Sequence, residues 1–291
     1  MAIESVAFIG LGAMGWRMAA HLPKHFNDVR VWNRTFEKAE QHAAVFGTTA
    51  SSIEHAVQAD VIFSCLPTSA QVEEVIWAYP PKAGSIWIDC TSGEPTSAQQ
   101  LDQQLQEYDV HFLDAPVSGQ TIGAENGTLT VMVGGNVQAL ERARPAIEAF
   151  SGLIEHVGES GSGFAVKAVN NMLLAVNLLA AAEGFSALKA HGVNIHSALN
   201  CINASSGKSN ATETVLPQRV FNRTFPNTFA LNLLAKDTGI ALDLVHRAKL
   251  PAPLLALTQS LIRAASDTSD ADSDFSAAVK LLESWTNIEL S

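Results

Sequence analysis

A glycine-rich loop near the start of the chain has the spacing of a phosphate-binding fingerprint, G-x-G-x-x-G. The loop consists of Gly10, Leu11, Gly12, Ala13, Met14 and Gly15. It directly follows a strand-like run, Ser5–Ile9, and opens a helical pattern, which is the context that the fingerprint requires. The glycines permit a tight turn, close approach of a pyrophosphate and close helix packing, while the helix N-terminus supplies N–H groups. The loop therefore predicts a dinucleotide site, although a glycine turn that merely joins strand to helix would have the same spacing.

The residues after the second strand-like run, Val29–Trp32, indicate which dinucleotide binds. An NAD site often has Asp or Glu there to hold the ribose 2′-hydroxyl, whereas this chain has Asn33, Arg34 and Thr35. A guanidinium and two short hydrogen-bonding side chains would hold a 2′-phosphate, which an acid would repel. We therefore expect NADP to be favoured. NAD remains an alternative, because an Arg34 that only stacks on adenine would leave both cofactors usable.

A long loop downstream, residues 114–129, has the composition of an anion-binding segment. It is too rich in glycine and hydroxyl groups to belong to the core. Successive backbone N–H groups in such a loop form a nest for an anion, for instance a substrate carboxylate. A long structural loop would have the same composition, so this segment alone does not decide between the two.

Lys167 and Asn171 lie one turn apart on a predicted helix, so their side chains share a face. A lysine near a helix N-terminus is electrostatically misplaced, because the helix dipole favours anions there. Such a lysine is usually a surface residue. Here the apolar helix, the glycine-rich approach to it and an amide within reach of the same point favour a functional role.

The elements that position these residues alternate between strand and helix in the first half of the chain. The strand-like runs are Ser5–Ile9, Val29–Trp32, Val61–Cys65, Ser85–Asp89, His111–Asp114 and Thr130–Val133. Amphipathic stretches between them include Trp16–Leu22, Ala39–Val45 and Ala98–Leu105. This alternation is typical of βαβ units, so we expect an α/β fold with a Rossmann-type, doubly wound and largely parallel sheet.

After the glycine-rich segment 158–163 the strand signals fade. Residues from Ala165 to about Lys189 form one helical pattern that is apolar around most of its circumference, so we expect this helix to be buried. Further helical segments are Ile195–Ile202, Asn232–His246, Leu254–Ala264 and Phe275–Glu283. We therefore predict a dinucleotide-binding Rossmann-type domain over residues 1–162 and an all-α C-terminal domain, for substrate binding and oligomerisation, over residues 163–291.

The overall composition excludes several classes of partner. The chain has 291 residues, of which 47% are hydrophobic and 16% charged, and its formal net charge is -11. An acidic chain is repelled by phosphate backbones and anionic lipids, so we expect no nucleic-acid and no membrane partner. An anionic small-molecule ligand would need local positive groups.

Cysteine usage and hydropathy predict a cytoplasmic protein without a metal. Cys65, Cys90 and Cys201 form no C-x-x-C pair and have no metal-ligand spacing, and an odd count suits a reducing compartment. No signal-peptide pattern precedes the initial strand-like run. The most apolar later stretch, Met172–Ala182, is interrupted by Asn177 and is shorter than the ~20 residues of a membrane span.

Several motifs occur in a family-specific order. They are Gly10–Met18 (G-L-G-A-M-G-W-R-M), Asp114–Leu129, Gly163–Asn171 (G-x-x-x-K-x-x-x-N), Lys236–Asp237 and Asp274–Ala277. In these segments the chain resembles the β-hydroxyacid dehydrogenases, the group that holds 3-hydroxyisobutyrate dehydrogenase, tartronate semialdehyde reductase and the succinic semialdehyde reductases. The resemblance covers essentially the whole chain and is far more specific than a glycine fingerprint alone.

The resemblance implies an active site in the cleft between the two domains. Lys167 would be the general acid/base, and Asn171 would be its companion on the substrate. The nicotinamide cofactor would exchange a hydride with the substrate carbon that bears oxygen. The implied reaction interconverts a small 3-hydroxy acid and its semialdehyde or keto form.

The resemblance also implies which residues bind the ligands. Ser118 and Gly119 would bind the substrate carboxylate, with Gln120 beside them. Lys236 and Asp237 would approach the substrate from the helical domain, and Lys236 would also contact the cofactor. The positions that match nicotinamide contacts are Leu66, Pro67 and Ser92.

Two departures from the family pattern lie where the pocket is expected. The family usually has a second glycine after Ser118–Gly119, whereas this chain has Gln120. Relatives often carry Trp where this chain has Asn210. The substrate is therefore expected to be more polar, or of a different size, than those of the better-known members.

Two alternatives to this function stay open at this point. An imine reductase shares the architecture, but those enzymes generally lack a lysine at the position of Lys167. A non-catalytic NADP-binding interaction module is disfavoured by the intact Lys167/Asn171 pair and phosphate loop. The apolar C-terminal helices and the resemblance favour a homodimer or homotetramer.

Overall fold

The computed structural model describes residues 3–291 and divides the chain into two compact units. The first unit ends at Lys167, and the second comprises Ala168–Ser291. Helix α8 (Ser162–Ala190) carries the chain from the first unit into the second. The first unit contains the sheet and the second is helical, which confirms the predicted fold class.

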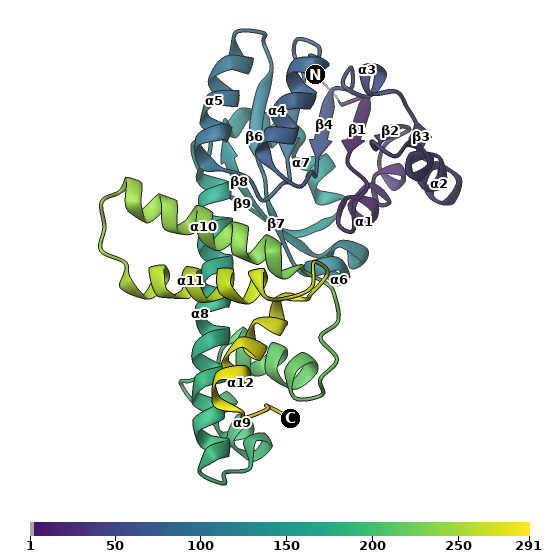
Figure 1. Cartoon of the computed structure of the whole chain (residues 1–291). Helices are drawn as coiled ribbons and strands as arrows, with labels where there is room; N and C mark the ends of the chain where they lie inside the picture. Colours follow the sequence, from purple (N-terminus) through teal and green to yellow (C-terminus); the bar gives the residue numbers. More distant parts are fainter. Residues whose placement is uncertain (1–2) are drawn as a thin grey trace. The chain divides into compact units, whose positions relative to one another are not determined.

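The first unit is built on one mixed, mostly parallel sheet, which has nine strands within residues 3–291 (Figure 1). The order across the sheet is β3-β2-β1-β4-β5-β6-β8-β7, and β9 pairs with β8. The strands are β1 (Ser5–Ile9), β2 (Asp28–Trp32), β3 (Thr49–Ala50), β4 (Val61–Ser64), β5 (Ile86–Asp89), β6 (His111–Asp114), β7 (Val117–Ser118), β8 (Leu129–Gly135) and β9 (Ser151–Gly158). Strands β1 to β6 are parallel, and β8 is antiparallel to β6 and β7. The strand order reverses between β1 and β4, and ligands of such sheets bind outside the carboxyl ends of the strands at this switch point.

The parallel strands are buried on both faces, which is why they read as continuous apolar runs. Val6 and Phe8 of β1 belong to one core cluster, while Ala7 and Ile9 belong to another, because successive side chains point to opposite faces. Helices α1, α2, α6 and α7 contribute to the first cluster, and α3, α4 and α5 contribute to the second. Their bounds are α1 (Gly15–Ala19), α2 (Phe36–Phe46), α3 (Ile53–Ala56), α4 (Ser69–Ala78), α5 (Pro95–Gln106), α6 (Gln120–Asn126) and α7 (Val137–Glu148).

Several local features differ from the sequence-based prediction. Strand β9 was not predicted, because most of its side chains are exposed or half-buried and so do not alternate between apolar and polar. Helix α1 is shorter than the predicted segment, since a 3-10 turn with Pro in its first positions, η1 (Leu22–Lys24), follows it. The segment expected to be one long loop, residues 114–129, contains strand β7 and helix α6.

The second unit is a cluster of helices around its own apolar core. After α8 come α9 (Ile195–Asn203), η2 (Ala211–Val220), α10 (Leu231–Arg247), α11 (Pro253–Asp267), η3 (Phe275–Ala278) and α12 (Val279–Thr286). A buried ion pair joins two of these elements, with Arg219 Nη1 of η2 lying 3.1 Å from Asp274 Oδ2. Asp274 also accepts a hydrogen bond from the Ser276 N–H at the start of η3. The motif that begins at Asp274 is therefore structural within this unit.

Helix α8 only partly matches the expectation of complete burial. Leu178, Ala182 and Phe185 lie in the core of the second unit, but Val169 and Leu173 are exposed. The helix is longer than the apolar stretch noted in the sequence, and among residues 3–291 it alone has the length and hydropathy of a membrane span. One such helix is weak evidence for a span, because the core helix of a soluble protein passes the same test.

Candidate active site

The glycine loop between β1 and α1 has the shape of a phosphate cradle. Gly10 has a φ of +96°, and a Cβ there would lie 2.5 Å from the Cys65 carbonyl oxygen. A Cβ at Gly15 would collide with the Gly10 carbonyl oxygen and with the Phe8 ring, so this glycine lets α1 pack on β1. At Gly12 a Cβ would meet nothing within 4 Å, and the residue is exposed. Neighbouring atoms therefore fill the space beside Gly10 and Gly15, whereas the space beside Gly12 is free, as the binding of a pyrophosphate requires.

Asn33, at the end of β2, holds this loop in place. Its Oδ1 accepts a hydrogen bond from the Leu11 N–H at 3.0 Å, and its Nδ2 donates to the Thr35 carbonyl oxygen at 3.0 Å. The oxygen and the nitrogen of the Asn33 amide thus each make a hydrogen bond, and together they join the glycine loop to the turn before α2. Arg34 and Thr35 are exposed in that turn.

The loops after β4 and β5 are organised by Asp89, which is 1% exposed. Asp89 Oδ1 accepts hydrogen bonds from the Ser64 hydroxyl at 2.9 Å and from the Thr91 N–H at 3.0 Å. The Thr91 hydroxyl oxygen in turn accepts a hydrogen bond from the Leu66 N–H at 3.1 Å. These contacts fix the two segments that carry Leu66, Pro67 and Ser92 at the carboxyl edge of the sheet. Asp89 was not among the residues singled out from the sequence, although an acid at the end of a buried strand is a signal for a residue that organises the adjoining loops.

The segment predicted to bind a carboxylate has a strained backbone. Ser118 lies in β7 opposite Thr130 of β8. The next two residues, Gly119 and Gln120, have φ values of +136° and +58°. A left-handed conformation costs a non-glycine residue about 1–2 kcal/mol, which explains a second glycine in the family pattern. Gln120 keeps the conformation that glycine would adopt, at the N-terminus of α6.

Asp114 ends β6 with its carboxylate buried against the start of α8. Oδ1 accepts a hydrogen bond from the Gly161 N–H at 2.7 Å, and Oδ2 accepts one from the Phe164 N–H at 2.8 Å. Burial raises the pKa of Asp114 to about 7, although the two backbone hydrogen bonds oppose this shift. Lys167 follows on the same helix, one turn after Phe164, and is half-buried.

In the second unit, the structure brings together Asn171, Lys236 and Asp237. The Asn171 Nδ2 donates to Asp237 Oδ2 at 2.6 Å, and both side chains are buried. Lys236 Nζ lies 3.5 Å from Asp237 Oδ1, with the lysine side chain 27% exposed. The carboxylate of Asp237 thus orients the amide of Asn171 and pairs with an ammonium group that remains accessible.

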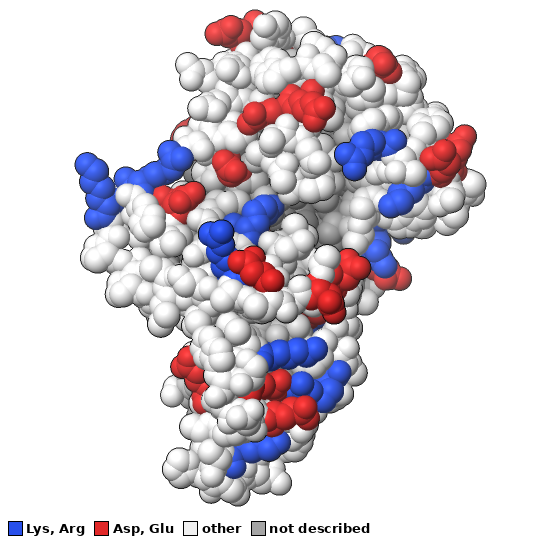
Figure 2. Space-filling view, viewed as in Figure 1, with Lys and Arg blue, Asp and Glu red and all other residues white. Residues whose placement is uncertain are grey.

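Asn210 does not join this group of residues. It precedes η2 and is exposed, in a segment where Lys208 Nζ pairs with Glu213 Oε1 at 2.6 Å. Among residues 3–291 there is no group of three or more His, Cys, Asp or Glu side chains able to hold a metal ion. Lysine and arginine side chains are interspersed with acidic ones on the face shown in Figure 2. Local positive groups therefore exist despite the net charge of -11.

Comparisons with known proteins cover both units. Residues 5–158 match the family described as the NAD binding domain of 6-phosphogluconate dehydrogenase. Residues 161–282 match the family described as NAD-binding of NADP-dependent 3-hydroxyisobutyrate dehydrogenase. Together the two matches span residues 5–282 except for residues 159–160.

Similar proteins extend over nearly the whole chain. An NAD-dependent L-serine dehydrogenase of Pseudomonas aeruginosa is 35% identical, over 97% of this chain and 98% of its own. A 2-(hydroxymethyl)glutarate dehydrogenase of Eubacterium barkeri is 34% identical, over 98% and 97%. The structure of Mycobacterium tuberculosis 3-hydroxyisobutyrate dehydrogenase with L-serine is 33% identical, has a TM-score of 0.89 and covers 97% of this chain and 99% of its own. The chain therefore belongs to the 3-hydroxyisobutyrate dehydrogenase, or β-hydroxyacid dehydrogenase, family and is an NAD(P)-dependent dehydrogenase.

Proposed function

We propose that this enzyme interconverts a small 3-hydroxy acid and its semialdehyde, with NADP favoured over NAD. The observation that carries the proposal is the Asn171 amide, oriented by the buried Asp237 carboxylate one helical turn after Lys167. An amide and a lysine amino group on one helix face are suited to hold the same substrate oxygen. Oxidation breaks the C–H and O–H bonds of the alcohol and forms a carbonyl.

When bound, NADP would supply the two-electron chemistry as the acceptor of the hydride from the alcohol carbon. Lys167 takes the hydroxyl proton in oxidation and returns it to the carbonyl oxygen in reduction. The Asn171 amide donates a hydrogen bond to that oxygen and fixes its position. Ser118 and the backbone N–H of Gly119 bind the substrate carboxylate. Lys236, in the second unit, is a further cation for an anionic ligand. Leu66, Pro67 and Ser92 contact the nicotinamide half of the cofactor.

The preference for NADP rests on the turn after β2. Arg34 and Thr35 are exposed there, and the position of an NAD-selecting acid is taken by Asn33, whose amide is engaged with the glycine loop. A guanidinium binds a phosphate with two parallel hydrogen bonds, and this contact is absent from a 2′-hydroxyl. The relative from Pseudomonas is named as NAD-dependent, so cofactor choice varies within the family.

The names of the relatives suggest a substrate class. L-serine, 3-hydroxyisobutyrate and 2-(hydroxymethyl)glutarate are all 3-hydroxypropanoates that differ only in the substituent on carbon 2. We assign this chain a substrate of the same class. Gln120 is polar where many relatives have glycine, which favours a polar substituent.

A panel assay tests the proposed function directly. L-serine, 3-hydroxyisobutyrate and 2-(hydroxymethyl)glutarate are each offered with NADP or NAD, and formation of the reduced cofactor is followed by absorbance. Lactate serves as the control, because its hydroxyl lies on carbon 2. We expect at least one 3-hydroxy acid to be oxidised faster than lactate, and faster with NADP. Binding of NADPH without turnover of any hydroxy acid or semialdehyde would instead support the non-catalytic module.

The remaining attributes follow from the family and the composition. An imine reductase is disfavoured because Lys167 is present. We propose a cytoplasmic homodimer or homotetramer without nucleic-acid or membrane partners. We also propose a domain boundary at residues 162/163. With this boundary, Lys167 and Asn171, which both lie on α8, belong to the same domain.

A further inference from the structure

The carboxylate of Asp114 connects the end of β6 to the start of α8. It stands at the end of β6, it is fully buried, and it accepts hydrogen bonds from the Gly161 and Phe164 N–H groups. These donors belong to the residue before α8 and to its first turn. The first N–H groups of a helix have no partner within the helix, so a carboxylate placed there both satisfies them and complements the helix dipole.

Two glycines make room for this contact. A Cβ at Gly134, near the end of β8, would lie 2.5 Å from Asp114 Oδ1. A Cβ at Gly163 would collide with the Met132 carbonyl oxygen and lie 2.6 Å from the Asp114 carbonyl oxygen. The first turn of α8 is therefore pressed against β6 and β8 with no space for a side chain. This gives a physical reason for glycine four positions before Lys167.

If helix capping were the only requirement at this position, a neutral side chain would meet it without the free-energy cost of burying a charge. Asp89 on the neighbouring strand is in register with Asp114, and its carboxylate also lies at the carboxyl edge of the sheet. Burial and this second acid both raise the pKa of Asp114. Ser, Thr or Asn caps helices without a buried charge. Buried acids with perturbed pKa values cluster at functional sites, where their position serves the chemistry.

We propose that Asp114 is the positioning residue for Lys167, and this inference rests on the proposed role of Lys167 as acid/base. The Asp114 carboxylate binds the Phe164 N–H and so fixes the first turn of α8. Lys167 lies one turn after Phe164 on the same helix. Asp114 also begins the segment that leads to Ser118, so the same residue connects this segment to the helix that carries Lys167. A displacement of about 1 Å in such a group lowers the rate about 100-fold.

The test is a double-mutant cycle of Asp114→Asn and Lys167→Ala in the full-length enzyme. An asparagine has one acceptor oxygen, so its amide N–H₂ faces one of the two backbone N–H groups. The assay uses whichever of 3-hydroxyisobutyrate, L-serine and 2-(hydroxymethyl)glutarate the enzyme oxidises fastest with NADP. We expect Asp114→Asn to lower kcat about 10- to 100-fold, with the Kd for NADPH changed less than about 2-fold.

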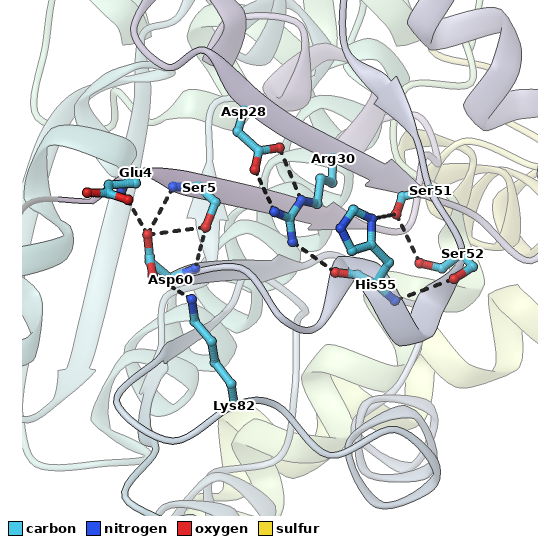
Figure 3. Close-up of polar contacts among 9 residues, drawn as sticks. All are labelled: Glu4, Ser5, Asp28, Arg30, Ser51, Ser52, His55, Asp60 and Lys82. Atoms are coloured by element: carbon cyan, nitrogen blue, oxygen red, sulfur yellow. Dashed lines mark hydrogen bonds and ion pairs between the residues drawn. The ribbon is translucent and has the colours of Figure 1, made fainter.

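Asp60→Asn is a matched control at the amino end of β4; Figure 3 shows Asp60 with its polar partners. Asp60 Oδ2 also accepts hydrogen bonds from two backbone N–H groups, those of Glu4 at 2.8 Å and Ser5 at 3.0 Å. Its other oxygen pairs with Lys82 Nζ at 2.7 Å. Because Asp60 lies before β4 and its carboxylate binds Glu4, Ser5 and Lys82, its replacement should lower Tm and leave kcat unchanged.

The cycle separates positioning from a general structural role. If Asp114 acts through Lys167, Asp114→Asn should change the residual kcat of Lys167→Ala less than about 2-fold. If Asp114→Asn lowers kcat as much in Lys167→Ala as it does in the native enzyme, the inference is overturned and the proposed function is left intact. A normal kcat in Asp114→Asn alone would have the same consequence. A normal kcat in Lys167→Ala would overturn both. If Asp114→Asn fails to fold, Asp114→Glu keeps both acceptors on a longer side chain and should show the same loss of kcat.

Discussion

Replacement of Arg34 by Asp should reverse the cofactor preference. The Asn33 amide is already bound to the glycine loop and to Thr35, so recognition of a 2′-phosphate depends mainly on Arg34. Loss of one hydrogen-bonded charge pair costs about 1.5–3 kcal/mol. An exposed like charge at about 4 Å adds roughly 1 kcal/mol of repulsion. The sum, about 2.5–4 kcal/mol, corresponds to roughly 70- to 1000-fold in the ratio of kcat/KM for NADPH and NADH.

The assay compares kcat/KM for NADPH and NADH in the native enzyme, in Arg34→Asp and in Arg144→Asp. Arg144 is a half-buried residue of α7 that pairs with Glu141 at 2.6 Å. Its replacement changes the net charge by the same amount on another helix, so it controls for the overall field. Equal kcat/KM values in the native enzyme, or the same change of ratio in both variants, would refute the reasoning from Arg34.

Three further predictions concern the carboxylate segment, the amide and the buried acid. Gln120→Gly should relieve the backbone strain at φ +58° and raise the free energy of unfolding by about 1 kcal/mol. It should also broaden the range of short hydroxy acids that the enzyme accepts, or shift the preference toward 3-hydroxyisobutyrate. An unchanged substrate ranking would show that Gln120 does not line the pocket. Asn171→Ala should raise KM and lower kcat less than Lys167→Ala does, and steady-state kinetics that show the reverse order would contradict its orienting role. Because the folded state raises the pKa of Asp114 to about 7, this group binds a proton more tightly when folded, so its contribution to stability should fall as the pH rises from about 4 to about 7. Denaturant titrations should show that slope reduced in Asp114→Asn, and an identical slope would count against a raised pKa.

Much of the fold was predictable because apolar runs and glycine positions are local signals. The buried strands β1, β4, β5 and β6 are nearly continuous apolar segments, and the order of strands and helices follows from their alternation with amphipathic stretches. Strand β9 was not predictable in this way, because its side chains are mostly exposed or half-buried and it pairs with β8 only through the tertiary fold. The exposed face of α8 was also missed, since hydropathy around a helix does not say which sides other elements cover.

The candidate site was predictable only where a motif marks it. The glycine loop and the Lys167/Asn171 spacing can be recognised in the sequence, whereas the supporting contacts join residues far apart in the chain. Asp114 meets Gly161 across 47 positions, and Asn171 meets Asp237 across 66. No local pattern shows that a carboxylate at the end of a strand reaches a helix N-terminus. The dual use of the Asn33 amide likewise required the structure.

The kcat of Lys167→Ala tests the central claim most directly. Loss of a positioned proton-transfer group should lower kcat by about 100- to 10,000-fold, and Lys167→Arg should be nearly as slow because a guanidinium does not release its proton at working pH. NADPH affinity should barely change, since the glycine loop and Arg34 are untouched. Lys189→Ala is the control on the same helix, because Lys189 donates to the carbonyl oxygens of Glu289 and Ser291 and should not affect kcat. A near-normal kcat in Lys167→Ala would contradict the proposed mechanism and leave the family and the fold.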